Sequence, residues 1–186
     1  MDPRDAATLI RAAIPRPGGA WADLGAGDGT FTRALVTLVG ADATIFAVER
    51  DAQALTELDR WAKAEAANVI PVAADFTAPF DLPGLDGAGL DGMLLANALH
   101  FVRDAGPVLA GLTARLRPGA RLVLVEYDRR RASRWVPYPI PITRLPELAA
   151  AAGLTTPVVT ATRPSAYGGL LYVAATDRLP GSTGRG

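Results

Sequence analysis

Short apolar runs alternate with longer segments of helical period along this chain, and this alternation limits the fold more than any other feature. The runs at Ala20–Leu24, Thr44–Val48 and Val69–Ala73 have the length and composition of buried strands. Segments of helical period over Thr30–Val39 and Ala52–Ala67 separate them. Strands that are joined through helices run parallel and carry helices on both faces of the sheet. The sequence therefore predicts a doubly wound α/β fold.

The second half of the chain continues this alternation with one interruption. A helix is expected after the third strand, yet Asp81–Gly89 reads DLPGLDGAG, and this density of proline and glycine predicts a loop or at most one turn. The other expected elements are strands at Asp91–Leu99 and Arg121–Tyr127 and helices at Asp2–Ile14, Ala105–Leu116 and Ile142–Ala152. The last two strands, expected at Thr156–Thr162 and Gly169–Ala175, are close enough in sequence to pair as a hairpin.

The composition indicates one globular domain that folds without covalent or metal cross-links. The chain has 186 residues, 49% of them hydrophobic, so it can bury a sizeable core. It has no cysteine, which excludes a disulfide framework, a thiolate zinc site and a cysteine nucleophile, and we expect no bound metal. A single domain is expected over residues 1–176, followed by a Gly-, Ser-, Thr- and Arg-rich tail at 177–186 that is predicted to be disordered.

Charge and hydropathy argue against several classes of partner. The nineteen basic and nineteen acidic residues cancel, which disfavours non-specific nucleic-acid binding as the main function. No stretch of about 18 apolar residues is free of charge, so no membrane span is expected. The charged start Met1–Asp5 is not followed by an apolar signal core, and we expect a cytoplasmic protein.

A glycine-rich turn follows the first expected strand. Gly25, Gly27 and Gly29 stand at every second position, which differs from the G-x-G-x-x-G pattern of dinucleotide-binding turns. Glycines at such a place let the backbone turn sharply and approach a ligand closely. Since ligands of parallel sheets bind beyond the carboxyl ends of the strands, this turn is either a plain connection or part of a binding site.

Three acidic residues end three successive expected strands beside this turn. Asp23 ends the first strand, where its carboxylate can face an ammonium group. Glu49 ends the second strand, where a carboxylate can accept both hydroxyls of a ribose. Asp75 ends the third strand and can accept from the exocyclic amine of adenine, while Phe76 packs on the ring. Three acids at successive strand ends, beside a glycine turn, favour a ligand site over chance.

Taken together, these motifs resemble those of class I S-adenosylmethionine-dependent methyltransferases, over most of the chain. The motifs that carry the resemblance are Asp23–Gly29, Glu49, Asp75–Phe76, Leu94–His100 and Leu116–Leu122. The resemblance implies a Rossmann-like, seven-stranded, mostly parallel sheet with an antiparallel last strand and helices on both faces. It also implies S-adenosyl-L-methionine as the cofactor, with the glycine turn on its methionine part, Glu49 on the ribose and Asp75 on the adenine amine. The cofactor-binding residues implied in this way are Asp23, Gly25, Ala26, Gly27, Glu49, Arg50, Asp75, Phe76 and Asn97.

The methyl acceptor is expected beyond the fourth strand, at Asn97–His100. This segment lacks the Asn/Asp-Pro-Pro-aromatic motif of the family's adenine-N6 enzymes, and the chain lacks the cysteine nucleophile of its cytosine-C5 enzymes. Asn97 is expected to hydrogen-bond the methionine end of the cofactor or the acceptor. His100 is the only histidine. It is our candidate catalytic residue, because an unperturbed imidazole pKa of about 6.5 suits a general base. The structural alternative is a cap on the next helix.

A charged and aromatic segment follows the fifth strand. It contains four arginines within Arg129–Arg134 and then aromatic and proline residues. One interpretation is a solvated charged loop. In the other, it is a wall of the acceptor site, with Tyr127, Trp135 and Tyr138 as contacts to a flat ring and an arginine paired with a carboxylate or phosphate.

The sequence therefore predicts a methyltransferase that acts on a small molecule, in a site that is either open or completed by a second copy in a homodimer. Two alternatives stay open at this point. One is an RNA methyltransferase that uses Arg129–Arg134, since RNA-binding sites also combine arginine with aromatic residues. The other is a cofactor-binding module without catalysis.

Overall fold

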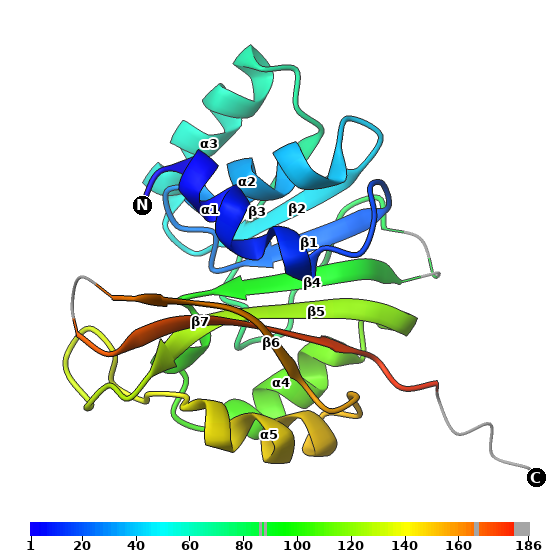
Figure 1. Ribbon diagram of the computed structural model, residues 1–186. Helices are drawn as coiled ribbons and strands as arrows, with labels where there is room; N and C mark the ends of the chain where they lie inside the picture. The colour runs from blue at the N-terminus through cyan, green and yellow to red at the C-terminus, as the bar shows by residue number, and fades with distance from the viewer. Residues whose placement is uncertain (86, 88, 166–167, 181–186) are drawn as a thin grey trace, which may run out of the picture.

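The computed structural model describes residues 1–85, 87, 89–165 and 168–180. It contains a seven-stranded sheet with the order β3-β2-β1-β4-β5-β7-β6. The first five strands are parallel, and β7 runs antiparallel to both β5 and β6. Helices lie on both faces of the sheet (Figure 1). This arrangement confirms the predicted doubly wound sheet, its antiparallel last strand and the hairpin at the end of the chain.

The elements follow the predicted order along the chain. The strands are β1 (Ala20–Leu24), β2 (Thr44–Glu49), β3 (Val69–Ala73), β4 (Leu90–Ala96), β5 (Leu116–Asp128), β6 (Val158–Pro164) and β7 (Leu170–Asp177). The α-helices are α1 (Pro3–Ile10), α2 (Thr30–Val39), α3 (Ala52–Ala64), α4 (Ala105–Thr113) and α5 (Leu145–Ala151), with short 3₁₀ helices at Arg11–Ala13, Leu99–Phe101 and Ile142–Arg144. None of the helices in the described part of the chain has the length and apolar character that a membrane crossing requires.

Two large hydrophobic cores, one on each face of the sheet, hold these layers together, and a small third cluster packs Leu58 of α3 against Ala47 of β2. Helices α1, α2 and α3 cover one face, and α4 and α5 cover the other (Figure 1). On the first face, Leu35 of α2 belongs to the same buried cluster as Ile45 of β2. On the second face, Leu109 of α4 and Leu148 of α5 share a cluster with Leu122 of β5. Alternate residues of the strands supply the two cores, so burial of apolar area fixes which way each strand faces.

Several boundaries differ from the predicted ones for local reasons. The fourth strand ends at Ala96 rather than Leu99, because Asn97 adopts a positive φ of 54° and Leu99–Phe101 forms a 3₁₀ turn. Helix α3 ends at Ala64 rather than Ala67, close to Ala66, which has a φ of 50°. A residue in the left-handed region commonly ends a helix. Asp81–Gly89 forms no helix among its described residues, as predicted.

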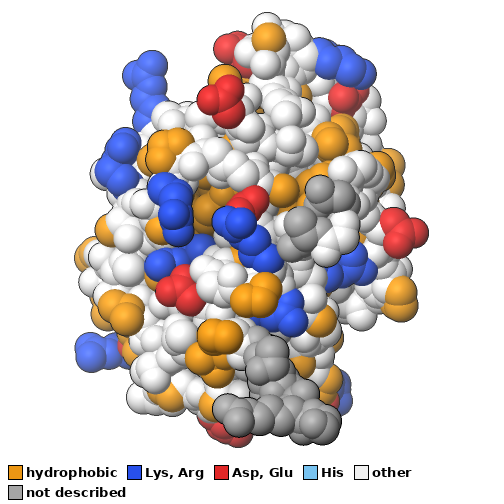
Figure 2. Space-filling model, turned by 90° about the vertical axis from the view of Figure 1, so that its right-hand side faces the viewer, with side chains coloured by type: hydrophobic (Ala, Val, Ile, Leu, Met, Phe, Trp, Pro, Cys, Tyr) orange, Lys and Arg blue, Asp and Glu red, His pale blue; other side chains and the backbone are white. Residues whose placement is uncertain are grey.

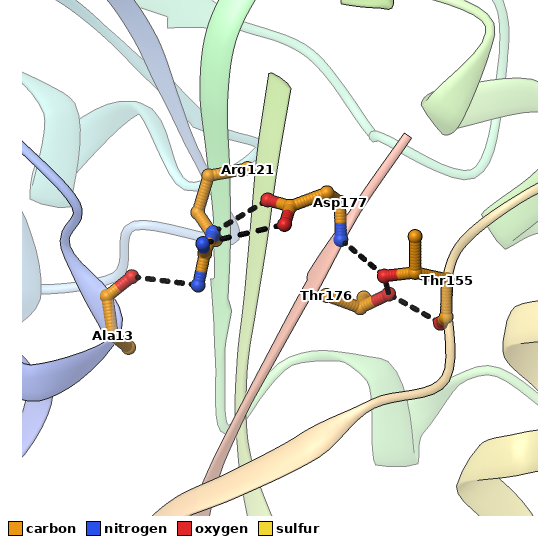
Figure 3. Close-up of polar contacts among 5 residues, drawn as sticks. All are labelled: Ala13, Arg121, Thr155, Thr176 and Asp177. Carbon is orange, nitrogen blue, oxygen red and sulfur yellow. Dashed lines mark hydrogen bonds and ion pairs between the residues drawn. The ribbon is translucent and has the colours of Figure 1, made fainter. Parts of the chain in front are cut away.

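The last strand extends beyond the predicted start of the tail. Strand β7 runs to Asp177, whose backbone N–H donates to Thr155 Oγ1 at 3.0 Å and whose carboxylate pairs with Arg121 at 2.8 Å (Figure 3). Thr176 donates to the Thr155 carbonyl at 2.6 Å, and Arg121 also reaches the Ala13 carbonyl at 3.5 Å (Figure 3). These contacts place residue 177 within the sheet, which corrects the prediction that the tail begins there. Residues 181–186 of that tail lie outside the described residues.

Candidate functional site

A cavity of about 580 Å³ opens at the carboxyl ends of the first four strands. Its wall is formed by the turn after β1, the end of β2 and the segments that follow β3 and β4. Such an edge of a parallel sheet is where ligands of doubly wound folds bind. The residues that line the cavity are Met1, Gly25, Ala26, Gly27, Asp28, Thr30, Phe31, Val48, Glu49, Arg50, Ala74, Asp75, Phe76, Thr77, Ala96, Asn97, Ala98, Phe101 and Val102.

The turn after β1 requires glycine at two of its positions. Gly25 has a φ of 75°, and a Cβ at this residue would lie 2.8 Å from the Ala98 Cβ. Gly29 has a φ of 78°, and a Cβ there would overlap the Leu58 side chain of α3. Both the positive φ and the lack of space exclude larger residues. The turn can therefore bring its backbone close to a ligand in the cavity while α3 packs tightly behind it.

Glu49 ties this turn to the end of β2. Its Oε2 atom accepts a hydrogen bond from the Gly27 N–H at 2.9 Å. Its Oε1 atom accepts from the N–H groups of Arg50 and Asp51 at 2.8 and 3.0 Å. A carboxylate has about four acceptor positions, so these three bonds fix the Glu49 side chain and leave capacity for a hydroxyl donor.

Asp75 lies in the cavity wall after β3 and is held there by Thr77, two positions further along the chain. Its Oδ1 atom accepts from both the backbone N–H and the hydroxyl of Thr77, at 2.9 and 2.7 Å. These bonds hold the pKa of the Asp75 carboxyl below its ordinary value, so Asp75 stays ionised. Its Oδ2 atom lies 3.8 Å from the guanidinium of Arg50, at the exposed rim of the cavity.

Two buried oxygen atoms at this end of the sheet have no hydrogen-bond partner among the described residues. They are Oδ1 of Asp23, at the end of β1, and Oδ1 of Asn97, after the neighbouring β4. The other oxygen of Asp23 accepts from the Thr32 hydroxyl at 2.7 Å. Burial of the carboxyl raises the pKa of Asp23 to about 7, an effect that the bond from Thr32 opposes and that Glu49 and Asp28 increase. Unpartnered buried acceptors are costly, so both atoms favour a donor ligand.

His100 lies beside the cavity, not in its wall. Its side chain is only 3% exposed, and its Nδ1 atom is 2.7 Å from Oε2 of Glu126, which is fully buried on β5. Its neighbours Ala98 and Phe101 line the cavity, with the Phe101 ring centroid 4.4 Å from the imidazole. The sequence alone gave no indication that His100 pairs with Glu126.

Tyr127 at the end of β5 and Tyr138 in the loop after it lie near His100, and neither they nor Trp135 line the cavity. Tyr138 donates its N–H to the His100 carbonyl at 3.0 Å, and its hydroxyl accepts from Arg103 at 3.1 Å. Tyr127 places its ring 5.8 Å from the imidazole. Trp135 is 66% exposed and is covered on one side by the guanidinium of Arg134. The loop is therefore built against His100, while Trp135 faces solvent.

The cavity thus brings together most of the residues that the sequence singled out. Of the expected cofactor-binding set, all but Asp23 line it directly, and Asp23 lies buried at the end of the adjacent strand. Phe101 and Thr77 also line the cavity, although the sequence motifs do not include them. The Asp-x-Thr spacing from Asp75 to Thr77 is a recognisable turn signal. Phe101 is 54% exposed, and no sequence pattern distinguishes it from a core aromatic.

The end of the molecule opposite the cavity carries basic side chains that make contacts within the protein. Figure 2 views the ends at which the parallel strands begin, where Lys and Arg side chains are spread across the centre of the surface. Arg117 pairs with Asp91, and Arg121 pairs with Asp177. Arg178 donates to backbone carbonyls that precede and begin β5. These arginines are therefore paired with acidic side chains and backbone carbonyls of the protein itself.

Comparison with known proteins agrees with this geometry. A model of the methyltransferase domain family matches residues 22–119, which is more than half of the chain. The chain belongs to the class I S-adenosylmethionine-dependent methyltransferases. It is therefore an enzyme that uses S-adenosylmethionine as the methyl donor, and the alternative of a module without catalysis is set aside. A search of curated protein sequences gives no match.

Several solved structures are similar to this chain in fold. One is a 1,6-didemethyltoxoflavin N1-methyltransferase from Burkholderia thailandensis with bound S-adenosylhomocysteine, at 26% identity and a TM-score of 0.73, covering 96% of this chain and 78% of that one. Another is an arsenic(III) methyltransferase from Chlamydomonas reinhardtii, at 18% identity and a TM-score of 0.71, covering 91% and 66%. A third is the [4+2]-cyclase SpnF, at 15% identity and a TM-score of 0.72, with an alignment that covers 96% of this chain and 81% of that one. The last two show the shared fold alone.

Proposed function

We propose that this methyltransferase transfers a methyl group from S-adenosylmethionine to a nucleophilic atom of a small molecule at the end of β4. The observation that carries the proposal is the pair of unpartnered acceptor atoms on Asp23 and Asn97, beside a cavity that also presents Glu49 and Asp75. S-adenosylmethionine offers donors for all four residues: an ammonium for Asp23 and Asn97, two ribose hydroxyls for Glu49 and an adenine amine for Asp75. The donor chemistry of the ligand and the acceptor chemistry of the site therefore match.

The proposed placement of the donor follows from this match. The carboxylate of Asp23 and the amide oxygen of Asn97 accept from the ammonium group, and the backbone of Gly25, Ala26 and Gly27 faces the methionine part. Glu49 accepts from the ribose. Asp75 accepts from the adenine amine, with Phe76 against the ring and Arg50 at the rim; all three residues line the cavity, and Arg50 lies 3.8 Å from Asp75.

The chemistry needs one displacement. When bound, S-adenosylmethionine presents a methyl carbon attached to a positively charged sulfur. The acceptor atom forms a bond to that carbon, the carbon–sulfur bond breaks, and its electron pair stays on sulfur to give S-adenosylhomocysteine. Most of the rate acceleration is expected from holding the two reactants in line. A proton acceptor is needed only where the nucleophile is a hydroxyl, an ammonium or an acidic carbon.

His100 is the proposed proton acceptor for such nucleophiles. It lies two positions after the cavity-lining segment Ala96–Ala98. Its Nδ1 atom is occupied by Glu126, which leaves Nε2 as the ring atom for proton transfer. Because the side chain is 3% exposed, this role requires the acceptor to enter beside Phe101 and reach the imidazole edge. The structural alternative predicted from the sequence, a cap on the next helix, is wrong, because His100 lies inside the 3₁₀ turn Leu99–Phe101 and the N-cap of α4 is Asp104. The burial of His100 instead supports a structural role in holding the turn after β4.

We propose a small, flat methyl acceptor because aromatic residues lie around His100. Phe101 exposes its ring in the cavity wall, and the loop that carries Tyr138 and Trp135 lies next to it. The Tyr127 ring centroid lies 5.8 Å from that of the imidazole. The methyltransferase that is 26% identical binds 1,6-didemethyltoxoflavin, which supports a small-molecule acceptor here.

An acceptor screen tests the proposal. The enzyme is incubated with S-adenosylmethionine and a panel of flat hydroxylated or nitrogen-containing ring compounds, and S-adenosylhomocysteine is quantified. We expect turnover with at least one class of small molecule and none with structured RNA. Turnover with RNA alone would replace the proposal with the RNA alternative. We further propose that the chain forms a single domain. We also propose that a second copy covers the open cavity in a homodimer, and sedimentation velocity in the presence of S-adenosylhomocysteine tests for this dimer.

A further inference from the structure

The imidazole of His100 and the carboxylate of Glu126 form a buried pair that the proposed function does not by itself explain. Glu126 lies near the end of β5, and none of its surface is exposed. Its Oε2 atom is 2.7 Å from Nδ1 of His100, and its Oε1 atom accepts the backbone N–H of the same residue at 3.1 Å. One buried side chain thus holds both the ring and the backbone of His100. A carboxylate that is removed from water is costly unless it is satisfied in this way.

The short distance between Nδ1 and Oε2 requires a proton between them. For a neutral imidazole, two arrangements satisfy it. In the first, the carboxylate is ionised and the Nδ1–H group donates, which leaves the lone pair of the neutral ring on Nε2. In the second, the carboxyl is protonated and donates to Nδ1, which leaves a hydrogen on Nε2. Only the first arrangement gives a ring that accepts a proton at Nε2.

The backbone contact favours the first arrangement. Because Oε1 already accepts an N–H group, the carboxylate form of Glu126 gains two donors from one residue, and hydrogen bonds to a charged form favour that form. The distance of 2.7 Å lies in the range of charge-assisted bonds. We propose that Glu126 is a positioning residue that fixes His100 in its Nδ1–H tautomer and presents Nε2 as the proton-accepting atom.

The same pair also connects to the loop that borders the acceptor site. The carbonyl of His100 accepts from the N–H of Tyr138, at 3.0 Å. The loop is anchored further by Tyr172, whose hydroxyl donates to the Ile140 carbonyl at 2.8 Å, and by Asp128, which accepts from the Ile142 N–H at 3.1 Å. Glu126 therefore holds the residue from which the aromatic loop is positioned. This inference rests on the proposed role of His100.

The tautomer can be measured directly because His100 is the only histidine in the chain. Long-range ¹H–¹⁵N correlation spectra of protein labelled at histidine give the protonation state of each ring nitrogen without an acceptor or any turnover. The spectrum is recorded as the pH is raised until the ring is neutral. We expect hydrogen on Nδ1 and a lone pair on Nε2. A neutral ring with hydrogen on Nε2 would overturn the proposal.

Two variants separate Glu126 from its surroundings. In Glu126→Gln the amide oxygen can still accept the His100 backbone N–H, while the amide N–H₂ donates to Nδ1, so we expect the ring to change to the Nε2–H tautomer. Asp128→Asn is the matched control, because Asp128 lies on the same face of β5 and contacts Ile142 instead of His100. The control should keep the Nδ1–H tautomer. An unchanged tautomer in Glu126→Gln, or the same change in Asp128→Asn, would contradict the proposal.

Kinetics distinguish this inference from the proposed function. With an acceptor in hand, Glu126→Gln should lower kcat by about 10²–10⁴-fold, with little change in the KM for S-adenosylmethionine. If the tautomer changes as expected while His100→Ala keeps full turnover, the positioning role of Glu126 stands and the catalytic role of His100 fails. Should Glu126→Gln be too unstable to purify, the wild-type spectrum by itself decides the tautomer.

Discussion

The Glu49 side chain accepts a hydrogen bond from the Gly27 backbone N–H at 2.9 Å and thereby joins the end of β2 to the glycine turn after β1. The residue proposed for the ribose and the turn proposed for the methionine part are thus a single unit. A change at Glu49 is expected to affect both parts of the cofactor. The stability of the fold is expected to change less, because the side chain lies at the half-buried end of a strand.

Replacement of Glu49 by alanine should weaken S-adenosylhomocysteine binding by about 2–4 kcal/mol, since hydrogen bonds to an ionised group are the stronger kind. Titration calorimetry measures the change. Glu57→Ala is the control, because it removes the same charge from the exposed face of α3. An unchanged dissociation constant in Glu49→Ala would remove Glu49 from the site.

The pKa of Asp23 predicts a pH-dependent stability. Burial raises this pKa from 3.8 to about 7, so the folded protein holds a proton that the unfolded chain releases. The stabilisation is complete below the unfolded pKa and is lost as the pH rises through about 7. Relative to Asp23→Asn, the free energy of unfolding of the wild-type protein should fall by up to about 4 kcal/mol over that range. Urea unfolding at a series of pH values measures it, and parallel curves for the two proteins would be the contrary result.

His100→Ala tests the proposed proton acceptor. If the acceptor atom carries a proton, turnover should fall by about 10²–10⁴-fold, while the affinity for S-adenosylhomocysteine stays the same. If His100 only holds the turn after β4, the variant should lose stability and keep its turnover. Steady-state rates together with thermal melting separate the two outcomes.

The arginines of the loop after β5 predict a weak affinity for RNA. Arg134 covers Trp135, and Arg129 lies 3.5 Å from Asp128, so part of the charge of this segment is already used within the protein. We expect any RNA binding to be weaker than micromolar and to fall steeply between about 50 and 200 mM salt. Fluorescence anisotropy with a structured RNA measures it. Tight binding at physiological salt would favour the RNA alternative.

Much of the fold was predictable because each element carries its own local signal. The apolar run of Ala20–Leu24 and the helical period of Thr30–Val39 coincide with β1 and α2. Burial on both faces produces such runs in parallel strands, and one-sided burial produces the helical period. The ends of elements were less predictable, because they depend on single backbone conformations such as the positive φ of Asn97.

The site was predictable where its residues occupy strand ends, and less so where distant segments meet. Glu49, Asp75 and Asn97 follow three strands whose carboxyl ends share one edge, so the topology alone brings them to one cavity. The pairing of His100 with Glu126 spans 26 positions and joins two strand ends through their side chains. No periodicity or spacing reports such a contact. The burial of Asp23, with its raised pKa, is likewise a product of packing.

Calorimetric titration of the wild-type protein with S-adenosylhomocysteine, and in parallel with NAD, tests the central claim most directly. The acceptor atoms of Asp23, Glu49, Asp75 and Asn97 match an ammonium group, a ribose and an adenine on one ligand. We predict saturable binding of one S-adenosylhomocysteine per chain and no saturable binding of NAD. At a ligand concentration one hundred times the dissociation constant, S-adenosylhomocysteine should stabilise the fold by about 2.7 kcal/mol. No measurable heat and no change in melting temperature with S-adenosylhomocysteine at millimolar concentration would contradict the account.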